Sequence, residues 1–241
     1  MIKRSLLLLI VLLGCSNFLF AQAWGGGADQ TDLSFGFSFS YVQSSFKIIK
    51  QPNWRQPFVD PETNTNVSSP LNSISSKNTP GFAVGFLTRY RLTEHLEARI
   101  TPSLVFSDRT VSYAYVLPEQ DVIKSVQATT VDFPLQLKLK SDRVGNMRAY
   151  LVGGLKYSGA IGSKKDAANT APTERLLQNV KGYASYEAGF GFDIYFEYFK
   201  LSPEIKLTNS FGNMLVAENT PYAVPINKLT LHTFMFSLFF E

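Results

Sequence analysis

The sequence predicts an all-β protein, an eight-stranded antiparallel up-and-down transmembrane β-barrel. Three observations support this fold class. The chain opens with the features of an export signal, eight later segments alternate apolar with small or polar residues, and the connections between them alternate short and long. Together they predict a protein that is exported through the periplasm and inserted in an outer membrane.

Residues 1–23 have the features of a secretory signal peptide. Lys3 and Arg4 precede a short apolar stretch, and Ala21-Gln22-Ala23 follows it. A basic start, a short apolar stretch and a small-x-small site are typical of a cleaved signal and not of a membrane span. We expect cleavage after Ala23, or alternatively after Ala21. Residues 24–31 then form a short periplasmic segment and residues 32–241 form the barrel.

A second kind of processing competes with this one. Leu12-Leu13-Gly14-Cys15 resembles a lipobox, which would make Cys15 a lipid-bearing N-terminus. Cys15 is the only cysteine, so a chain cut after Ala23 has neither a disulfide nor a thiolate metal site. The same cut removes Lys3 and Arg4 and lowers the formal charge from +4 to +2. A near-neutral chain has no electrostatic footprint for nucleic acid.

Eight segments have the two-residue period of a β-strand. The first carries Phe35, Phe37 and Phe39 on one face and only serine and glycine on the other. The chain has 20 Phe and 11 Tyr, yet no apolar run after the signal approaches the roughly 18 residues of a membrane helix. Strands with one apolar face account for both facts. The eight segments are 33–41, 82–91, 96–107, 132–140, 150–158, 185–196, 201–208 and 234–240.

The connections fall into two classes. Those after the second, fourth and sixth segments are short, at 93–95, 141–146 and 197–199. Outer-membrane barrels have short periplasmic turns and long external loops, whereas a β-sandwich has no reason to alternate in this way. Closure follows because an open sheet edge in hydrocarbon costs several kcal/mol per unpaired backbone group. The long connections are 51–80, 117–128, 161–182 and 212–227.

The inward faces of the strands carry five cations and five anions. Eight strands enclose an interior that side chains can just fill. We therefore predict an ion-paired, plugged lumen and not a pore. The alternative, one solvent-facing side of a soluble sheet, leaves the aromatic face unexplained unless two sheets stack. The predicted lumen network is Arg89, Glu97, Arg99, Asp132, Lys138, Lys156, Glu187, Asp193, Glu204 and Lys206.

Three prolines lie inside strand patterns. Pro102, Pro134 and Pro203 each remove a backbone donor from the ladder. A closed barrel has no free edge on which to place them, so we expect bulges or strand ends at these positions.

No pattern for catalysis or for a cofactor is found. His95 falls in a predicted turn and His232 on the lipid-facing side of the last strand, with no metal-ligand spacing between them. Gly189-Phe190-Gly191 lacks the third glycine and the helix of a dinucleotide site. We predict a protein that is not an enzyme, with no catalytic residue, cofactor, metal or small-molecule substrate.

The connection 51–80 is the candidate interaction loop. It carries Trp54, Arg55 and Phe58 among Asn, Ser, Thr and Pro. Aromatic and arginine side chains are frequent anchors of protein interfaces. The same loop can equally serve as a cap on the barrel.

Several stretches resemble the PorT-like family of Bacteroidota outer-membrane barrels, which is associated with the type IX secretion system. The resemblance spans nearly the whole mature chain, and its most family-specific element is Tyr198-Phe199-Lys200-Leu201-Ser202-Pro203-Glu204. Two further stretches, 131–137 and 150–154, are shared with a broader class of Bacteroidota barrels. The other stretches are 212–215 and the aromatic C-terminal strand, although Glu241 follows its last aromatic residue.

The resemblance implies an accessory role in protein secretion, with no enzymatic activity and no cofactor. The barrel fold implies contact with outer-membrane lipid, and the resemblance adds secretion-system proteins as partners. The alternative is a small transport or adhesion barrel that binds a ligand or a surface through its long external loops.

Overall fold

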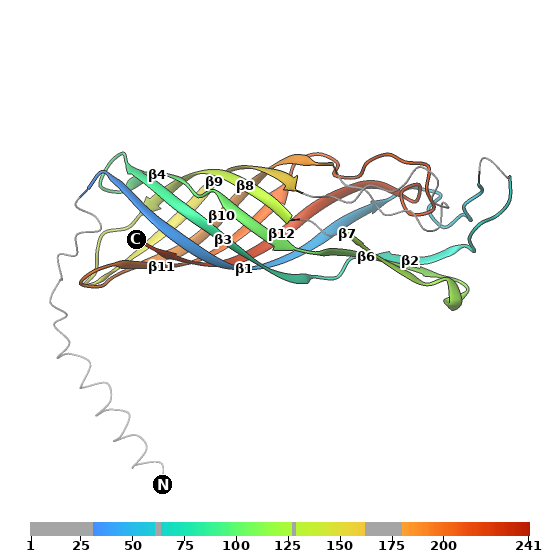
Figure 1. Cartoon of the computed structure of the whole chain (residues 1–241), viewed down its shortest axis with the longest axis horizontal. Helices are drawn as coiled ribbons and strands as arrows, with labels where there is room; N and C mark the ends of the chain where they lie inside the picture. Colours follow the sequence, from blue (N-terminus) through green and yellow to red (C-terminus); the bar gives the residue numbers. More distant parts are fainter. Residues whose placement is uncertain (1–30, 61–63, 127–128, 162–179) are drawn as a thin grey trace, which may run out of the picture.

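The computed structural model describes residues 31–60, 64–126, 129–161 and 180–241. The signal peptide and most of the segment 24–31 lie outside these residues. The described strands form one closed barrel with a smaller sheet that extends from one end (Figure 1). Among the described residues no helix is long and apolar enough to cross a membrane.

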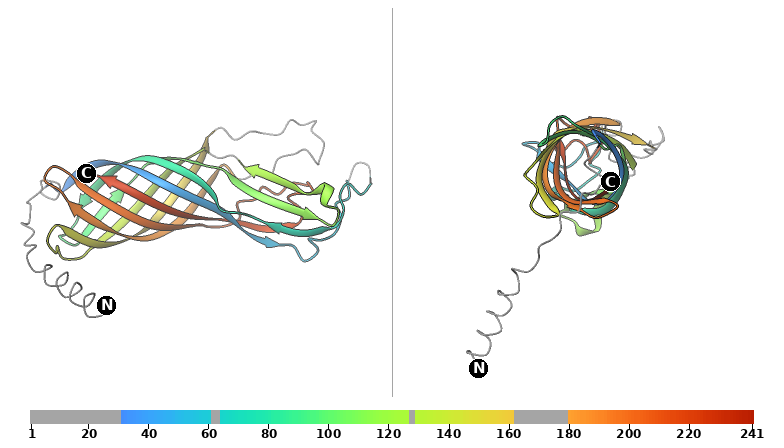
Figure 2. Two further views of the ribbon diagram at one scale, coloured as in Figure 1. Left: turned by 90° about the horizontal axis from the view of Figure 1, so that it is seen from below. Right: turned by 90° about the vertical axis from the view of Figure 1, so that its left-hand side faces the viewer.

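The barrel has eight strand positions, as predicted. Seven are single strands, and β4 and β5 together fill the eighth because both pair with β3 and with β8. The ring closes where β1 pairs with β3 on one side and with β12 on the other (Figure 2). The barrel strands are β1 (Leu33–Lys50), β3 (Thr79–Arg91), β4 (Leu96–Ile100), β5 (Ser103–Ser107), β8 (Thr129–Lys140), β9 (Met147–Ile161), β10 (Gly182–Tyr195), β11 (Lys200–Ser210) and β12 (Ile226–Phe240).

The alternation of the side chains is confirmed along the strands. Phe37 and Phe39 of β1 are about half exposed on the outer surface, while Ser38 between them is buried. The same holds for Leu135 and Leu137 of β8, which flank the buried Gln136. The outer surface of the barrel is therefore apolar, as a wall in contact with lipid requires.

The three predicted short turns lie at the end of the barrel that also holds the end of β12 (Figure 1). Since short turns are periplasmic, the smaller sheet lies at the external end. This sheet consists of β2 (Leu71–Ser75), β6 (Arg109–Tyr115) and β7 (Val122–Val126), with a short 3-10 helix, η3 (Pro118–Gln120). This sheet was not predicted: β2 and β7 lie in the connections 51–80 and 117–128, which were expected to be loops, and β6 lies between the predicted segment 96–107 and the second of these connections.

The three prolines act differently from the prediction. Pro102 separates β4 from β5, which is one of the expected strand ends. The expectation of bulges or strand ends is wrong at Pro134 and Pro203, because β8 and β11 continue through them in constant register. Each of these two prolines interrupts hydrogen bonding to one neighbouring strand only, since a proline lacks one donor but keeps strand geometry.

Candidate functional site

The lumen of the barrel holds a lattice of buried charges. All ten residues of the predicted lumen network are at most 6% exposed. They come from β3, β4, β8, β9, β10 and β11, and strand alternation turns each of them inward. Their ion pairs form three levels between the periplasmic turns and the external sheet.

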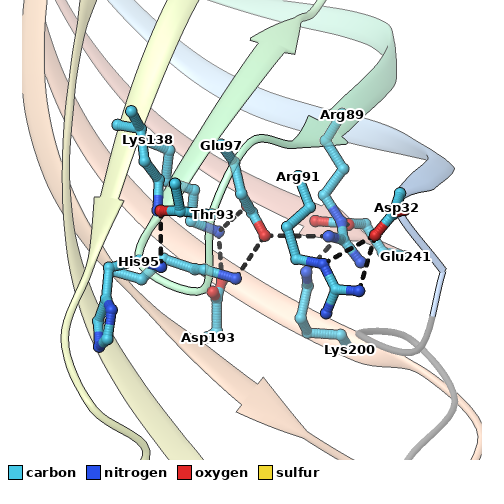
Figure 3. Close-up of polar contacts among 12 residues, drawn as sticks. Asp32, Arg89, Arg91, Thr93, His95, Glu97, Lys138, Asp193, Lys200 and Glu241 are labelled. Carbon is cyan, nitrogen blue, oxygen red and sulfur yellow. Dashed lines mark hydrogen bonds and ion pairs between the residues drawn. The ribbon is translucent and has the colours of Figure 1, made fainter.

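The level nearest the periplasm is centred on Glu97. Its carboxylate accepts from Arg89 Nη1 at 3.0 Å and from the Nζ of Lys140. Lys138 Nζ lies 2.7 Å from Asp193 Oδ1, and Ser202 donates to the same oxygen at 2.6 Å. Figure 3 shows Glu97 between Arg89 and Lys138, with Asp193 below.

The side chain of Glu241 also belongs to this level. Arg89 Nε donates to its carboxylate, and Lys200 Nζ lies 2.9 Å from the same oxygen (Figure 3). The backbones of Lys200 and Glu241 exchange two hydrogen bonds, of 2.7 and 3.0 Å. The residue that departs from the aromatic end of the last strand thus binds two lumen cations.

The middle level is centred on Glu204. Arg99 Nη2 lies 2.6 Å from Glu204 Oε2, and the hydroxyl of Tyr150 donates to the same oxygen at 3.1 Å. Arg99 Nε donates to Gln136 Oε1 at 2.7 Å. Its guanidinium also lies 4.6 Å from the ring centre of Phe239, so Arg99 combines an ion pair, a hydrogen bond and a ring contact.

Two further pairs complete the lattice. Gln136 Nε2 donates to Glu187, and Lys206 Nζ lies 3.5 Å from Glu187 Oε1, which joins Glu187 to the middle level. Toward the external end, Lys156 Nζ lies 2.7 Å from Asp132 Oδ2. Every predicted anion therefore has a cation within 4 Å.

At the external end of the barrel, beyond the charges, strands β1, β10 and β12 share with the smaller sheet a buried apolar cluster that we call the cap. Tyr113 of β6 is fully buried, packs edge-on against Tyr222 at 5.2 Å and donates to its backbone carbonyl at 2.8 Å. Burial raises the pKa of Tyr115 to about 12, so this phenol stays neutral at physiological pH. The cap consists of Phe46, Leu71, Ile74, Val111, Tyr113, Tyr115, Tyr183, Met214, Leu215, Tyr222, Ala223, Ile226, Leu229 and Leu231.

Sequence reasoning missed part of the lattice and all of the cap. Lys140 shares the inward face of Lys138 and could have been included on that ground. Lys200 and Glu241 share the inward parity of Ser202 and Phe239, but they lie just outside the predicted segments 201–208 and 234–240 and were therefore not included. For the cap, the alternation of Val111, Tyr113 and Tyr115 was the available signal.

The candidate loop residues are placed differently from one another. Trp54 is half-buried beside the cap, with Lys50 Nζ 4.0 Å and the Arg55 guanidinium 5.0 Å from its ring centre. Phe58 is only 8% exposed, and its backbone is bonded to Val67 and Ser68. The interpretation of Phe58 as an interface anchor is corrected, because its side chain is buried.

The two histidines lie far apart on the surface. His95 is in a periplasmic turn, where its Nε2 lies 2.9 Å from Asp142 Oδ1. The hydrogen bond and the charge of His95 lower the pKa of Asp142. His232 faces outward on β12 and is bonded to the side chain of Asn209. Among the described residues no group of three His, Cys, Asp or Glu side chains is arranged to hold a metal ion.

A comparison with protein families agrees with this architecture. The family model for the outer membrane protein beta-barrel domain matches residues 20–216. No curated protein sequence matches. Among solved structures, OprG from Pseudomonas aeruginosa is 12% identical with a TM-score of 0.48, covering 86% of this chain and 93% of that chain.

Two other solved barrels are similarly distant. Ail of Yersinia pestis, in complex with a heparin analogue, is 12% identical with a TM-score of 0.38, covering 87% of this chain and 99% of Ail. AlkL in lipid bilayers is 13% identical with a TM-score of 0.37, covering 84% of this chain and 87% of AlkL. The family assignment rests on the family model, which matches most of the chain, and on the closed ring of strands. The chain belongs to the outer membrane protein beta-barrel domain family and is a small β-barrel of the outer membrane.

Proposed function

We propose that this barrel is a non-enzymatic accessory component of protein secretion, PorT-like and associated with type IX secretion, that acts through contacts at its two rims. The observation that carries the proposal is the filled interior. Three levels of ion pairs occupy the lumen, and the cap lies beyond them at the external end. A barrel filled in this way offers its surface, and not a conduit, to other molecules.

The energetics of the lattice favour this role over passage of a solute. Removing one partner of a buried ion pair costs about 3–5 kcal/mol. A solute that crosses the lumen has to separate Arg99 from Glu204 and Lys138 from Asp193, and then displace the cap. Such a barrier is incompatible with rapid diffusion, so activity is better assigned to the turns and loops.

The PorT-like segment divides its residues between the two environments. Lys200, Ser202 and Glu204 point into the lumen and are buried, whereas Tyr198 in the preceding turn is 89% exposed. Phe196 and Phe199 on either side of it stack at 4.7 Å, and the Phe196 N–H donates to the Phe199 carbonyl at 2.9 Å, which holds the turn closed. An exposed tyrosine on a rigid turn is suited to an interface, and we assign Tyr198 as the periplasmic contact of the proposed role.

Deletion of the gene tests the proposal. Export of type IX substrates into the medium should stop in the deletion strain, and the wild-type gene should restore it. The variant Tyr198→Ala should reduce export while the barrel still assembles. Glu94→Ala, in another exposed periplasmic turn, is the matched control and should export normally. Normal secretion by the deletion strain would remove the proposal.

The second candidate is a transport or adhesion barrel that binds through its external loops. The observation that favours it is the cluster of Lys50, Trp54 and Arg55, in which two cations flank an indole at the external rim. Such a cluster suits an anionic ligand or surface. Binding of an acidic polysaccharide to the wild-type protein, lost in Trp54→Ala/Arg55→Ala, together with normal secretion in the deletion strain, would favour this candidate.

A further inference from the structure

The lipid-facing wall of the barrel contains a hollow that we call the notch. It has a volume of about 380 Å³ and lies over β1, β3 and β5, with one residue contributed by β8. Its outward side chains are all apolar. The lining residues are Phe37, Ser38, Phe39, Val84, Gly85, Phe86, Pro102, Ser103, Leu104 and Val131.

The register of the strands explains why the wall is hollow at this point. Phe39, Val84 and Leu104 lie in one row around the barrel, and the next row begins with Phe37 and Phe86. In the first row the short side chain of Val84 stands between two longer ones. In the second row the compact ring of Pro102 follows Phe86, whose N–H donates to the Pro102 carbonyl at 2.9 Å. Val84 and Pro102 thus form the floor of the notch.

The aromatic wall of the notch is held in place from behind. The ring of Phe37 stacks on Phe240 of β12 at 5.1 Å and meets Phe39 edge-on at 5.8 Å. These contacts fix the side chains before any ligand arrives. A preformed site binds with a smaller loss of side-chain entropy than one that must be ordered.

At the floor of the notch, two backbone hydrogen bonds between neighbouring strands are missing. Because residue 102 bonds to β3, strand alternation directs the backbone groups of Thr101 to β8. The residue opposite Thr101 by register is Pro134, which has no N–H. Two consecutive rungs therefore lack a donor, at Pro102 on one side and at Pro134 on the other. An occupant of the notch adds packing where the ladder lacks hydrogen bonds.

We propose that the notch binds one acyl chain of an outer-membrane lipid. The notch opens on the apolar outer wall, so hydrocarbon is what surrounds it. Among its lining residues no side chain is charged, which leaves nothing to bind a headgroup. Val84 lies about midway along β3, away from both ends of the strand, where only the chain of a lipid reaches.

The physical gain is in packing and not in dehydration. Lipid tails are as apolar as the wall, so the hydrophobic effect gives no preference between them. A chain seated on Val84 and Pro102 restores the dispersion contacts that the hollow otherwise loses. The volume of the notch lies within the roughly 300–1,000 Å³ of typical ligand sites. One chain should therefore reside in the notch longer than its neighbours reside elsewhere on the wall.

Photolabelling in lipid tests this proposal. The full protein is placed in phosphatidylethanolamine nanodiscs with a trace of the same lipid carrying a diazirine at the end of one acyl chain. After photolysis, label should concentrate several-fold on peptides of β3 and β5 over peptides of β9. Val84→Phe, which fills the floor, should abolish this excess. Leu155→Phe adds a ring to the outer face of β9, outside the notch, and should leave the excess unchanged.

Several outcomes would overturn the proposal. Uniform labelling of the wild-type wall contradicts it, and this result stands even if Val84→Phe fails to fold. An excess that persists in a folded Val84→Phe protein contradicts it as well, as does equal labelling by a diazirine next to the headgroup. A photoreactive residue at Phe86 in cells should capture lipid. Capture of a membrane-embedded protein there would replace the lipid by a protein partner.

Discussion

Neutralising Glu204 should destabilise the barrel strongly. The carboxylate is 1% exposed and accepts from Arg99 at 2.6 Å and from Tyr150 at 3.1 Å, with Lys206 at 3.8 Å. Glu204→Gln keeps the shape of the side chain but leaves two buried cations without their shared anion. Breaking a buried pair in this way costs about 3–5 kcal/mol. We expect the free energy of unfolding to fall by an amount at the lower end of that range, because the amide oxygen of Gln still accepts one hydrogen bond.

Urea unfolding in lipid vesicles measures the loss, with heat-modifiable gel migration as the readout of the folded barrel. Glu94→Gln makes the same chemical change in an exposed turn and should shift stability by less than about 0.5 kcal/mol. The double variant Arg99→Met/Glu204→Leu removes both charges and should recover part of the loss, because matched apolar replacements of a buried pair are often neutral or stabilising. A Glu204→Gln protein as stable as the control would refute the view that the lattice supports the barrel.

Three further outcomes are expected. Phe190→Arg, five residues from the periplasmic end of β10, should lower the free energy of unfolding by about 2–4 kcal/mol in the same assay. Phe192→Arg, three residues from that end, should lower it less, because the penalty of a lipid-facing cation falls toward the interface. Wild-type protein in planar bilayers should give no stable conductance steps, since the lattice of ion pairs occupies the lumen, and frequent steps would contradict a plugged lumen. The raised pKa of Tyr115 means that its contribution to cap stability is complete below the unfolded value of about 10 and is lost as the pH rises through about 12; protease resistance of the external sheet should fall across this window, and less steeply in Tyr115→Phe.

The barrel and its lumen were accessible to sequence reasoning because membrane insertion imposes a strict two-residue period. Lipid on one side and a narrow interior on the other give every strand residue only two environments. A charged residue such as Lys138 or Glu187 inside an otherwise apolar strand therefore has to face inward. Which cation meets which anion depends on the stagger of strands distant in sequence, and no local pattern contains that information.

The external sheet escaped prediction for a physical reason as well. Outside the bilayer the outer face of a strand meets water, so β6 alternates buried tyrosines with Thr110, Ser112 and Ala114 and has no apolar outer side. That pattern is the reverse of the one in the barrel, where the apolar residues face outward. The pattern of a lipid-facing strand is therefore absent from β6, because its aromatic residues face inward.

The prolines affect both the outer wall of the barrel and the stretch of lumen behind it. Pro134 and Pro203 were expected to distort their strands, yet both keep the register and lose a hydrogen bond on one side only. A closed barrel tolerates this loss because each strand is held by two neighbours, whereas an edge strand has one. The lost hydrogen bond still has an energetic cost, however, because within hydrocarbon it leaves one backbone carbonyl without its partner in the ladder. A different pair, Pro102 and Pro134, removes the N–H donors of two successive hydrogen-bonded positions. These positions lie beneath the notch on the outside and beside Asp132 in the lumen. The wall thus lacks two backbone donors where it is hollow outside, and the buried pair of Asp132 with Lys156 lies on the lumen side of the same stretch.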